Sequence, residues 1–351
     1  MKIKATYRKY LLQFILPAGT SRGTYTVKPT WYLFLSDKEN PGITGIGECN
    51  ILKDLSIDDV ENYEDKIQRI CNEINASDFD FQDPLYALPS IRFGLDMALK
   101  DLKQGGTKEL FPGSFTKGET GISTNGLIWM GSIEFMEQQI TKKIAAGFRC
   151  IKMKIGATDW ESERSILSNI RKQYSATELT LRVDANGAYT EKTVYPVLED
   201  LARLEIHSIE QPIRAGNWKL MAQLCNSSPV PIALDEELIG ISTPAQKTKL
   251  AEYVKPQYLI LKPALIGGFR AAEEWITLAE KQNIKWWATS ALESNIGLNA
   301  ISQWVATKNT SLPQGLGLGS LYQNNIPSPL TLVKDKMYYL TDNCWDLKNI
   351  S

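Results

Sequence analysis

Cys150-Ile151-Lys152-Met153-Lys154 decides the fold, because it is the first of a series of short apolar runs that each end in a charged residue. The later runs end at Asp184, Glu210, Asp235 and Lys262. Successive charges, counted from Lys154, lie 30, 26, 25 and 27 residues apart. A strand with its crossover helix takes roughly 25–30 residues. The series therefore predicts successive strand ends of a parallel barrel, the place where barrel enzymes hold their chemistry.

The remaining length fits one barrel and a smaller domain. The chain has 351 residues, and a barrel takes about 250 of them. Residues 1–118 show strand-like runs followed by helical patterns, which predicts an α+β domain. Residues 119–323 alternate between eight strands and intervening helices, which predicts the barrel. Residues 324–351 carry no further repeat, and we expect this tail to pack back on the first domain.

Three local patterns give more specific expectations. Ser56 can cap a helix that runs through Ile70, because apolar residues recur there at helical spacing. The turn-rich stretch 17–23 is expected to form a loop. The glycine-rich stretch 315–321 is expected to form the last barrel strand.

Composition excludes several classes of protein. The net charge of −1 gives no attraction to nucleic acid or to an anionic membrane. No apolar run approaches the ~20 residues that a membrane span needs. The five cysteines are scattered and form no CxxC pair, which is typical of reduced thiols in the cytoplasm. We therefore expect a cytoplasmic protein, and the sequence leaves its oligomeric state open.

Histidine is almost absent, which restricts the chemistry. His207 is the only histidine, it lies in an apolar frame, and the chain has no GxSxG motif. A histidine-based triad and most zinc sites are therefore excluded. Acid–base work falls to Lys, Asp, Glu or Tyr.

The three acidic strand ends predict a metal site. Asp184, Glu210 and Asp235 end successive strands, so their carboxylates should converge and repel one another. A divalent cation relieves that repulsion, and oxygen ligands without His or Cys favour Mg²⁺, with Mn²⁺ as the alternative. The competing interpretation, in which each acid only caps a helix or pairs with a surface cation, explains any one of them better than all three together.

The lysines predict proton abstraction. Lys152 and Lys154 are two residues apart on one strand, so both side chains face the barrel interior. Like-charge repulsion should lower their pKa values and leave one lysine as a usable general base. Lys262 lies four strand units further on and should face Lys154 across the pocket. A metal with a lysine on either side suits abstraction of a proton next to a carboxylate, with the metal and Lys262 stabilising the enediolate.

These residues resemble those of the enolase superfamily, in its muconate-lactonizing-like subgroup. The matching motifs are Lys152-Met153-Lys154, Asp184-Ala185-Asn186, Glu210-Gln211-Pro212, Asp235-Glu236 and Lys262-Pro263. Each triplet is weak evidence alone, but the five occur in the family's order and spacing. The resemblance implies a modified TIM (β/α)7β barrel with an N-terminal α+β capping domain that closes over the barrel mouth.

The same resemblance implies roles for individual residues. It implies metal binding by Asp184, Glu210 and Asp235, with Lys154 as the base and Lys262 opposite it. Asn186 and Glu236 would orient the ligands. Lys152 would tune Lys154 or contact the substrate carboxylate.

The last strands suggest which reaction is catalysed. Dipeptide epimerases of the subgroup carry Asp-x-Asp on the last strand, whereas residues 315–320 here contain no acid. The stretches 290–294, which begins with Ser290, and 125–129 resemble o-succinylbenzoate synthases. That family's reaction is an Mg²⁺-dependent syn-dehydration of a cyclohexadiene carboxylate with a succinyl arm. The resemblance therefore implies a carbon–oxygen lyase of menaquinone biosynthesis that acts on a small-molecule carboxylate.

Other assignments stay open at this stage. Arg22, in the loop expected to cover the substrate, could meet the succinyl carboxylate. An N-acylamino acid racemase or dipeptide epimerase would share the same metal–lysine core. A non-catalytic relative that only binds a carboxylate is the third reading, and it has no physical need for two lysines beside a metal.

Overall fold

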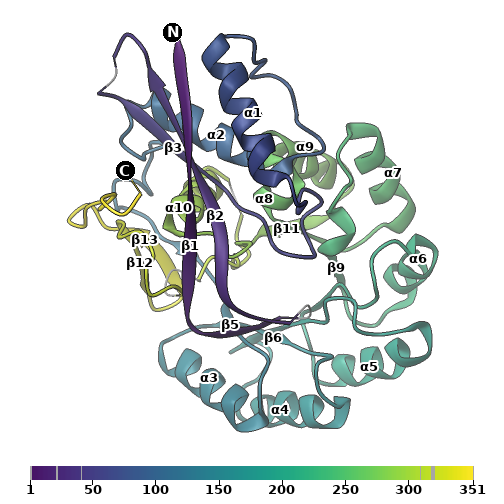
Figure 1. The fold of residues 1–351 in the computed structure, drawn as a ribbon. Helices are drawn as coiled ribbons and strands as arrows, with labels where there is room; N and C mark the ends of the chain where they lie inside the picture. The colour runs from purple at the N-terminus through teal and green to yellow at the C-terminus, as the bar shows by residue number, and fades with distance from the viewer. Residues whose placement is uncertain (1, 21–22, 41, 309, 318–320, 351) are drawn as a thin grey trace.

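The computed structural model describes residues 2–20, 23–40, 42–308, 310–317 and 321–350. An N-terminal sheet with two helices lies against a curled parallel sheet with helices on its outer side (Figure 1). The predicted (β/α)7β barrel with an N-terminal α+β domain is confirmed. No helix in the described part of the chain is both long and apolar enough to cross a membrane.

The N-terminal domain, called the cap below, is an antiparallel sheet covered by two helices. Its elements are β1 (Ile3–Thr20), β2 (Gly23–Asp37), β3 (Thr44–Cys49), α1 (Tyr63–Ala76) and α2 (Pro89–Lys103), with sheet order β1-β2-β3. Helix α2 lies so close to β3 that a Cβ atom added at Gly47 would fall 1.9 Å from the carbonyl oxygen of Gly94. Glycine at both positions therefore permits this backbone-to-backbone packing.

Two expectations for the cap are wrong. Ser56 does not begin a helix, because its hydroxyl accepts a hydrogen bond from the Leu52 amide in a turn, and α1 begins only at Tyr63. The described residues of the stretch 17–23 do not form a loop either, since β1 continues to Thr20 and β2 starts at Gly23. Strand pairing of 18–20 with 23–25 overrides the local turn preference there.

The barrel follows the predicted alternation. Its elements are β5 (Gly126–Ile128), α3 (Ile133–Ala145), β6 (Cys150–Lys154), α4 (Trp160–Gln173), β7 (Thr180–Asp184), α5 (Glu191–Arg203), β8 (Ser208–Glu210), α6 (Trp218–Ser227), β9 (Ile232–Leu234), η1 (Glu236–Leu238), α7 (Pro244–Val254), β10 (Tyr258–Leu261), α8 (Pro263–Ile266), α9 (Gly268–Lys281), β11 (Lys285–Ala288) and α10 (Asn295–Ala306). Strands β5 to β11 pair in chain order and in parallel.

The eighth strand position is described only in part. In the part of this segment that the structure describes, Gln314 bridges to Thr124 on one edge of the sheet and Gly315 bridges to Thr289 on the other. Residues 318–320 of the predicted strand lie outside the described residues. The two bridges nevertheless close the barrel.

The C-terminal residues form a small sheet beside the cap. Strands β12 (Leu330–Val333) and β13 (Lys336–Tyr339) pair with β4 (Ile122–Ser123) in the order β12-β13-β4. Further on, Ile350 shares an apolar cluster with Tyr32 and Ile46 of the cap. The boundaries predicted for cap, barrel and tail stay a prediction.

Candidate active site

The charged residues that end the apolar runs meet at the C-terminal end of the barrel. Lys154, Asp184 and Glu210 are the last residues of β6, β7 and β8, while Asp235 and Lys262 directly follow β9 and β10. The three carboxylates are 1–2% exposed. The period seen in the sequence thus corresponds to one ring of strand ends, and it brings the predicted residues together.

Each lysine of the ring contacts a carboxylate. The Lys152 ammonium lies 2.9 Å from Asp184 Oδ2 and donates to both oxygens of Glu210, at 2.9 and 3.0 Å. The Lys154 ammonium lies 3.2 Å from Asp184 Oδ2 and donates to Asn186 Oδ1 at 2.6 Å. Lys262 donates to Asp235 Oδ2. At the barrel mouth, positively charged lysines therefore alternate with negatively charged carboxylates.

These contacts reverse one expectation for the lysine pair. Burial alone would lower the pKa of Lys152, but the carboxylates of Asp184 and Glu210 outweigh it and raise that pKa. The prediction that like-charge repulsion lowers the pKa of Lys152 is therefore wrong, because it ignored carboxylates on neighbouring strands. Burial likewise opposes the charge of Lys262, yet Asp235 and Glu236 raise its pKa, which keeps this side chain cationic.

The carboxylates are not equally compensated. Burial opposes the charge of Asp184, but the lysines, Lys152 first, lower its pKa. In contrast, burial and the charges of Asp184 and Asp235 raise the pKa of Glu210 well above its usual value. A further cation among these oxygens would relieve that penalty. The donor set, three buried carboxylates on adjacent strands, has the oxygen chemistry that Mg²⁺ takes.

The carboxylates face ammonium groups as the structure stands. Within the described ranges, no three His, Cys, Asp or Glu side chains stand in positions that would already hold a metal ion. Lys152 lies between Asp184 and Glu210, where it serves as a stand-in cation. The assignment of Asp184, Glu210 and Asp235 as metal ligands therefore stays a prediction that the donor chemistry supports.

Residues next to the ring fix its geometry. Asn186, at φ +45°, donates from Nδ2 to Glu236 Oε1 at 2.9 Å and so links Lys154 to Glu236. Sequence reasoning gave no role to Gln211, which is fully buried at φ +41°. Its Oε1 accepts from the amides of Asp235 (3.1 Å) and Glu237 (3.2 Å). Its place directly after Glu210 was the available signal, since it is thereby brought to the same ring of strand ends.

A cavity of about 100 Å³ opens onto this ring and is covered by the cap. Lys152, Lys154, Lys262, Asp184, Asn186 and Glu236 form its polar floor. Leu52 and Leu55 of the cap, with Leu127 of β5 and Trp129 directly after that strand, add apolar walls. Sequence analysis had not singled out these cap leucines as pocket residues.

The structure describes one of the two predicted contacts to the substrate arm, Ser290, but not the other, Arg22. Ser290 lines the cavity, but its hydroxyl donates to Glu293 Oε2, so that proton is already used within the protein. Burial raises the pKa of Glu293 to about 7. Arg22 lies outside the described residues, and its role stays a prediction.

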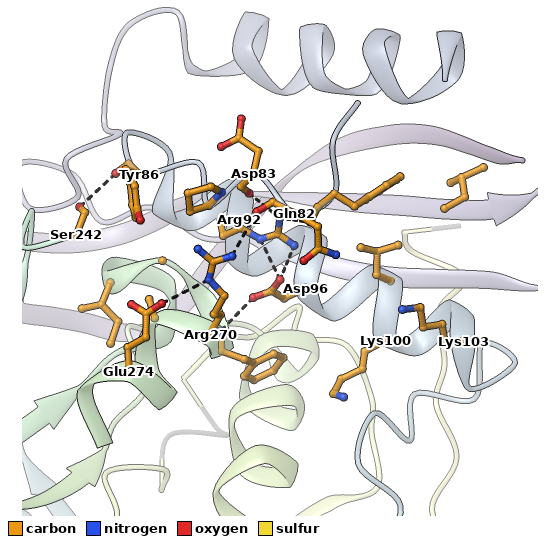
Figure 2. Close-up of a pocket in the computed structure, with 18 residues that line it drawn as sticks. Gln82, Asp83, Tyr86, Arg92, Asp96, Lys100, Lys103, Ser242, Arg270 and Glu274 are labelled. Carbon is orange, nitrogen blue, oxygen red and sulfur yellow. Dashed lines mark hydrogen bonds and ion pairs between the residues drawn. The ribbon is translucent and has the colours of Figure 1, made fainter. Parts of the chain in front are cut away.

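A second and larger cavity, of about 570 Å³, lies elsewhere between cap and barrel (Figure 2). Arg92 of α2 lies there and donates from Nε to Asp96 Oδ1 at 2.9 Å, while its Nη1 donates to the Phe81 and Asp83 carbonyls at 3.0 Å each. Asp96 Oδ2 in turn accepts from the Phe269 amide of α9 at 3.0 Å. The buried charges of this cleft are satisfied by the protein and tie the cap to α9.

His207 has no part in the ring. It precedes β8, at the opposite end of the strands, where Nδ1 lies 2.9 Å from Ser208 Oγ. Burial lowers the pKa of His207 to about 4, so its imidazole is neutral at pH 7.

Comparison with known proteins places these features in a family. Residues 136–342 match the model of the enolase C-terminal domain-like family. The chain is 43% identical to an o-succinylbenzoate synthase from Desulfotalea psychrophila, over 94% of this chain and 97% of that protein. The crystal structure of MenC from the same organism superposes with a TM-score of 0.86 at 39% identity, covering 96% of this chain and all of the other. The L-Ala-D/L-Glu epimerase from Bacillus subtilis superposes with a TM-score of 0.81 at 19% identity, covering 99% and 98%, which is a likeness of fold alone.

Proposed function

The chain belongs to the enolase superfamily, and on that premise we propose that it catalyses the o-succinylbenzoate synthase reaction. The reaction dehydrates 2-succinyl-6-hydroxy-2,4-cyclohexadiene-1-carboxylate to 2-succinylbenzoate. The observation that carries the proposal is the 43% identity to an o-succinylbenzoate synthase over nearly the whole of both chains. The protein is thus an enzyme of the carbon–oxygen lyase class.

Asp184, Glu210 and Asp235 would hold a divalent cation, and Mg²⁺ is the ion that enzymes of this superfamily generally use. When bound, the ion supplies positive charge that binds the ring carboxylate and favours the enediolate form of the substrate. The charge penalty on Glu210 supports this assignment, because burial and the neighbouring carboxylates disfavour its ionised form.

Lys154 is the proposed general base. It lines the cavity, and its hydrogen bonds to Asn186 and Asp184 fix where its nitrogen lies. As the free amine, Lys154 takes the proton from the carbon that bears the ring carboxylate. The hydroxyl on the neighbouring carbon then leaves with that proton as water. One C–H and one C–O bond break on the same face, and the ring becomes aromatic.

Lys262 is the proposed electrostatic partner on the other side of the pocket. It follows β10, four strand positions from β6 in the barrel. The nearby acids raise its pKa, so it stays an ammonium through the reaction. A fixed positive charge there stabilises negative charge as it develops on the substrate without reorganising during the step.

The other polar residues orient this set. Lys152 bridges Asp184 and Glu210 and so holds two of the proposed ligands. Asn186 joins the base to Glu236. Ser290 and Arg22 stay proposed contacts to the succinyl arm, Ser290 as an acceptor because its proton is used by Glu293.

The wider assignments follow from the same function. We assign residues 1–118 to the cap, 119–323 to the catalytic barrel and 324–351 to a tail against the cap. The product feeds menaquinone synthesis, and a cytoplasmic enzyme without nucleic-acid or membrane partners suits that small carboxylate substrate.

Racemisation of N-acyl amino acids is a second candidate, and the lysine arrangement favours it. Lys154 and Lys262 line one cavity from strands on different sides, as removal and return of a proton on opposite faces requires. Dipeptide epimerisation is less favoured, because Gly315 and Gly317 of the last strand position bring no acid to the cavity for a substrate ammonium.

Turnover of the cyclohexadiene substrate tests the proposal. Loss of its ultraviolet absorbance is followed with the full chain in Mg²⁺ and again after chelation. Fast, metal-dependent loss that Lys154→Ala abolishes supports the synthase. No turnover, together with α-proton exchange of N-acyl amino acids in D₂O, would favour the racemase instead.

A further inference from the structure

One cap carboxylate is hydrogen-bonded almost entirely by the barrel. Glu48, the penultimate residue of β3, is 0% exposed. Its Oε1 accepts from the Ser294 amide at 3.0 Å, and its Oε2 accepts from the Ser294 hydroxyl at 2.6 Å and the Gly297 amide at 2.9 Å. The fourth bond, at 2.9 Å, comes from Thr30 in the cap. The carboxylate therefore crosses the domain boundary and has all four of its main acceptor positions used.

This contact caps a barrel helix from the other domain. Ser294 is the N-cap of α10, and the first turn of that helix contains no acidic residue of its own. The first amides of a helix lack partners within it, and a negative charge there is favourable. Glu48 supplies both the acceptors and the charge. Gly297 allows the approach, because a Cβ atom there would lie 3.0 Å from Glu48 Oε2 and 2.6 Å from Glu293 Cγ.

The capped turn is continuous with a wall of the active-site cavity. Ser290, Ala291 and Leu292 line that cavity and lead directly into Ser294. A second cap residue holds the same segment, since Asn50 Nδ2 donates to the Ala291 carbonyl at 2.9 Å. Cap residues thus hold this segment at Ala291 and at Ser294, three residues apart.

A comparable carboxylate elsewhere in the cap lacks this connection. Asp101 of α2 is also 0% exposed and accepts from the amides of Ile46 (2.8 Å) and Lys108 (2.7 Å). Lys108, with which Asp101 forms an ion pair at 2.9 Å, also precedes the barrel in the sequence. Asp101 stabilises the cap in the same chemical way, but its partners Ile46 and Lys108 do not line the active-site cavity. The Lys108 carbonyl accepts from Asn299 and Gln303, which lie further along α10 than residues 290–297.

We propose that Glu48 is a positioning residue for the substrate pocket. By capping α10 across the domain boundary, it holds the segment Ser290–Leu292 where the substrate's arm meets the barrel wall. The correct pocket shape then exists only when cap and barrel are docked. The inference rests on the proposed function for its kinetic consequence, while the structural consequence is measurable without substrate.

The experiment compares Glu48→Gln with Asp101→Asn as the matched control. A glutamine retains the size of Glu48 but turns an NH₂ group toward hydrogen-bond donors of α10. Amide hydrogen exchange in Mg²⁺ without substrate should rise about tenfold or more at residues 290–297 in Glu48→Gln and should not change there in Asp101→Asn. KM for the cyclohexadiene substrate should rise about fivefold to tenfold in Glu48→Gln, with kcat within about threefold of the wild type.

The two readouts separate the possible failures. Unchanged exchange at 290–297, or a KM change no larger than that of Asp101→Asn, would overturn the positioning role. Absence of turnover in the wild type would overturn the proposed function, and the exchange comparison would still decide the role of Glu48. If Glu48→Gln does not fold, Ser294→Ala removes the bond from the Ser294 hydroxyl to Glu48 together with the cap bond that this hydroxyl accepts from the Ile296 amide. It should raise KM about twofold to fivefold, and an unchanged KM in that variant contradicts the proposal.

Discussion

The two cavities between cap and barrel differ in size and in chemistry, and the smaller one carries the candidate site. The strand-end cavity holds about 100 Å³, against about 570 Å³ for the cleft beside Arg92 (Figure 2). In the small cavity, lysines and acids from several strands converge, and Glu210 keeps a penalty on its charge. In the large cleft, Arg92 and Asp96 satisfy each other and the backbone around them. Convergent charge, rather than volume, distinguishes a reactive site from a domain junction.

Replacing Lys154 should give the largest effect in this comparison. Lys154→Ala removes the proposed base, and kcat should fall about 10²–10⁴-fold because positioned general bases contribute that much. Rapid-quench turnover measures the fall, and binding of Mn²⁺, followed by its paramagnetic signal, serves as the control for an intact metal site. Retained turnover in Lys154→Ala would show that the small cavity is not the site of the reaction.

Replacing Lys262 should give a somewhat smaller loss. Lys262→Met keeps the volume but removes the charge that faces the enediolate, and kcat should fall about 10²–10³-fold, the scale of one lost electrostatic contact in a transition state. KM should change little, because the ground state needs that charge less. A variant with lowered affinity but normal kcat would instead make Lys262 a binding residue.

Replacing Arg92 should give the opposite pattern. Arg92→Met leaves Asp96 buried without its partner, so the free energy of unfolding should fall by about 3–5 kcal/mol. Activity below the melting transition should remain near that of the wild type. Denaturant melts and kcat/KM measure the two quantities, and a selective loss of activity in the folded variant would show that the large cleft has a catalytic role.

The smallest expected effect concerns Glu293 and pH. Its pKa is raised in the folded state to about 7 from about 4.3 in the unfolded chain. The folded protein thus binds more protons between these values, so this group's contribution to stability is present at low pH and is lost as pH rises through about 7.

Glu293→Gln should remove that dependence. Relative to the wild type, the variant should gain stability on the order of 3 kcal/mol at pH 8 and lose that advantage toward pH 4.5. Unfolding curves in urea at several pH values measure the difference. An equal shift at all pH values would mean that Glu293 does not titrate in this range.

Sequence reasoning predicted the barrel and its ring because both depend on a period along the chain. Lys154, Asp184 and Lys262 needed only to end their strands to meet at one edge. Sequence reasoning could not predict properties that depend on partners from other strands. The raised pKa of Lys152 depends on Asp184 and Glu210. The roles of Gln211 and Glu48 depend on which backbone amides they accept from. The helix expected from Ser56 failed for a related reason, since a local turn with Leu52 overrides the apolar spacing.

Within the described residues, the pairing that closes the barrel is shorter than the pairing of β6 with β7. Strands β6 and β7 are paired over five positions, whereas Gln314 and Gly315 join the two sheet edges through one bridge on each side. Gly315 and Gly317 also line the small cavity. Local opening of the barrel costs the least free energy where the fewest backbone hydrogen bonds must break. Because Gly315 and Gly317 line the cavity, we expect this wall of the pocket to yield before the β6–β7 pair, which carries Lys154 and Asp184.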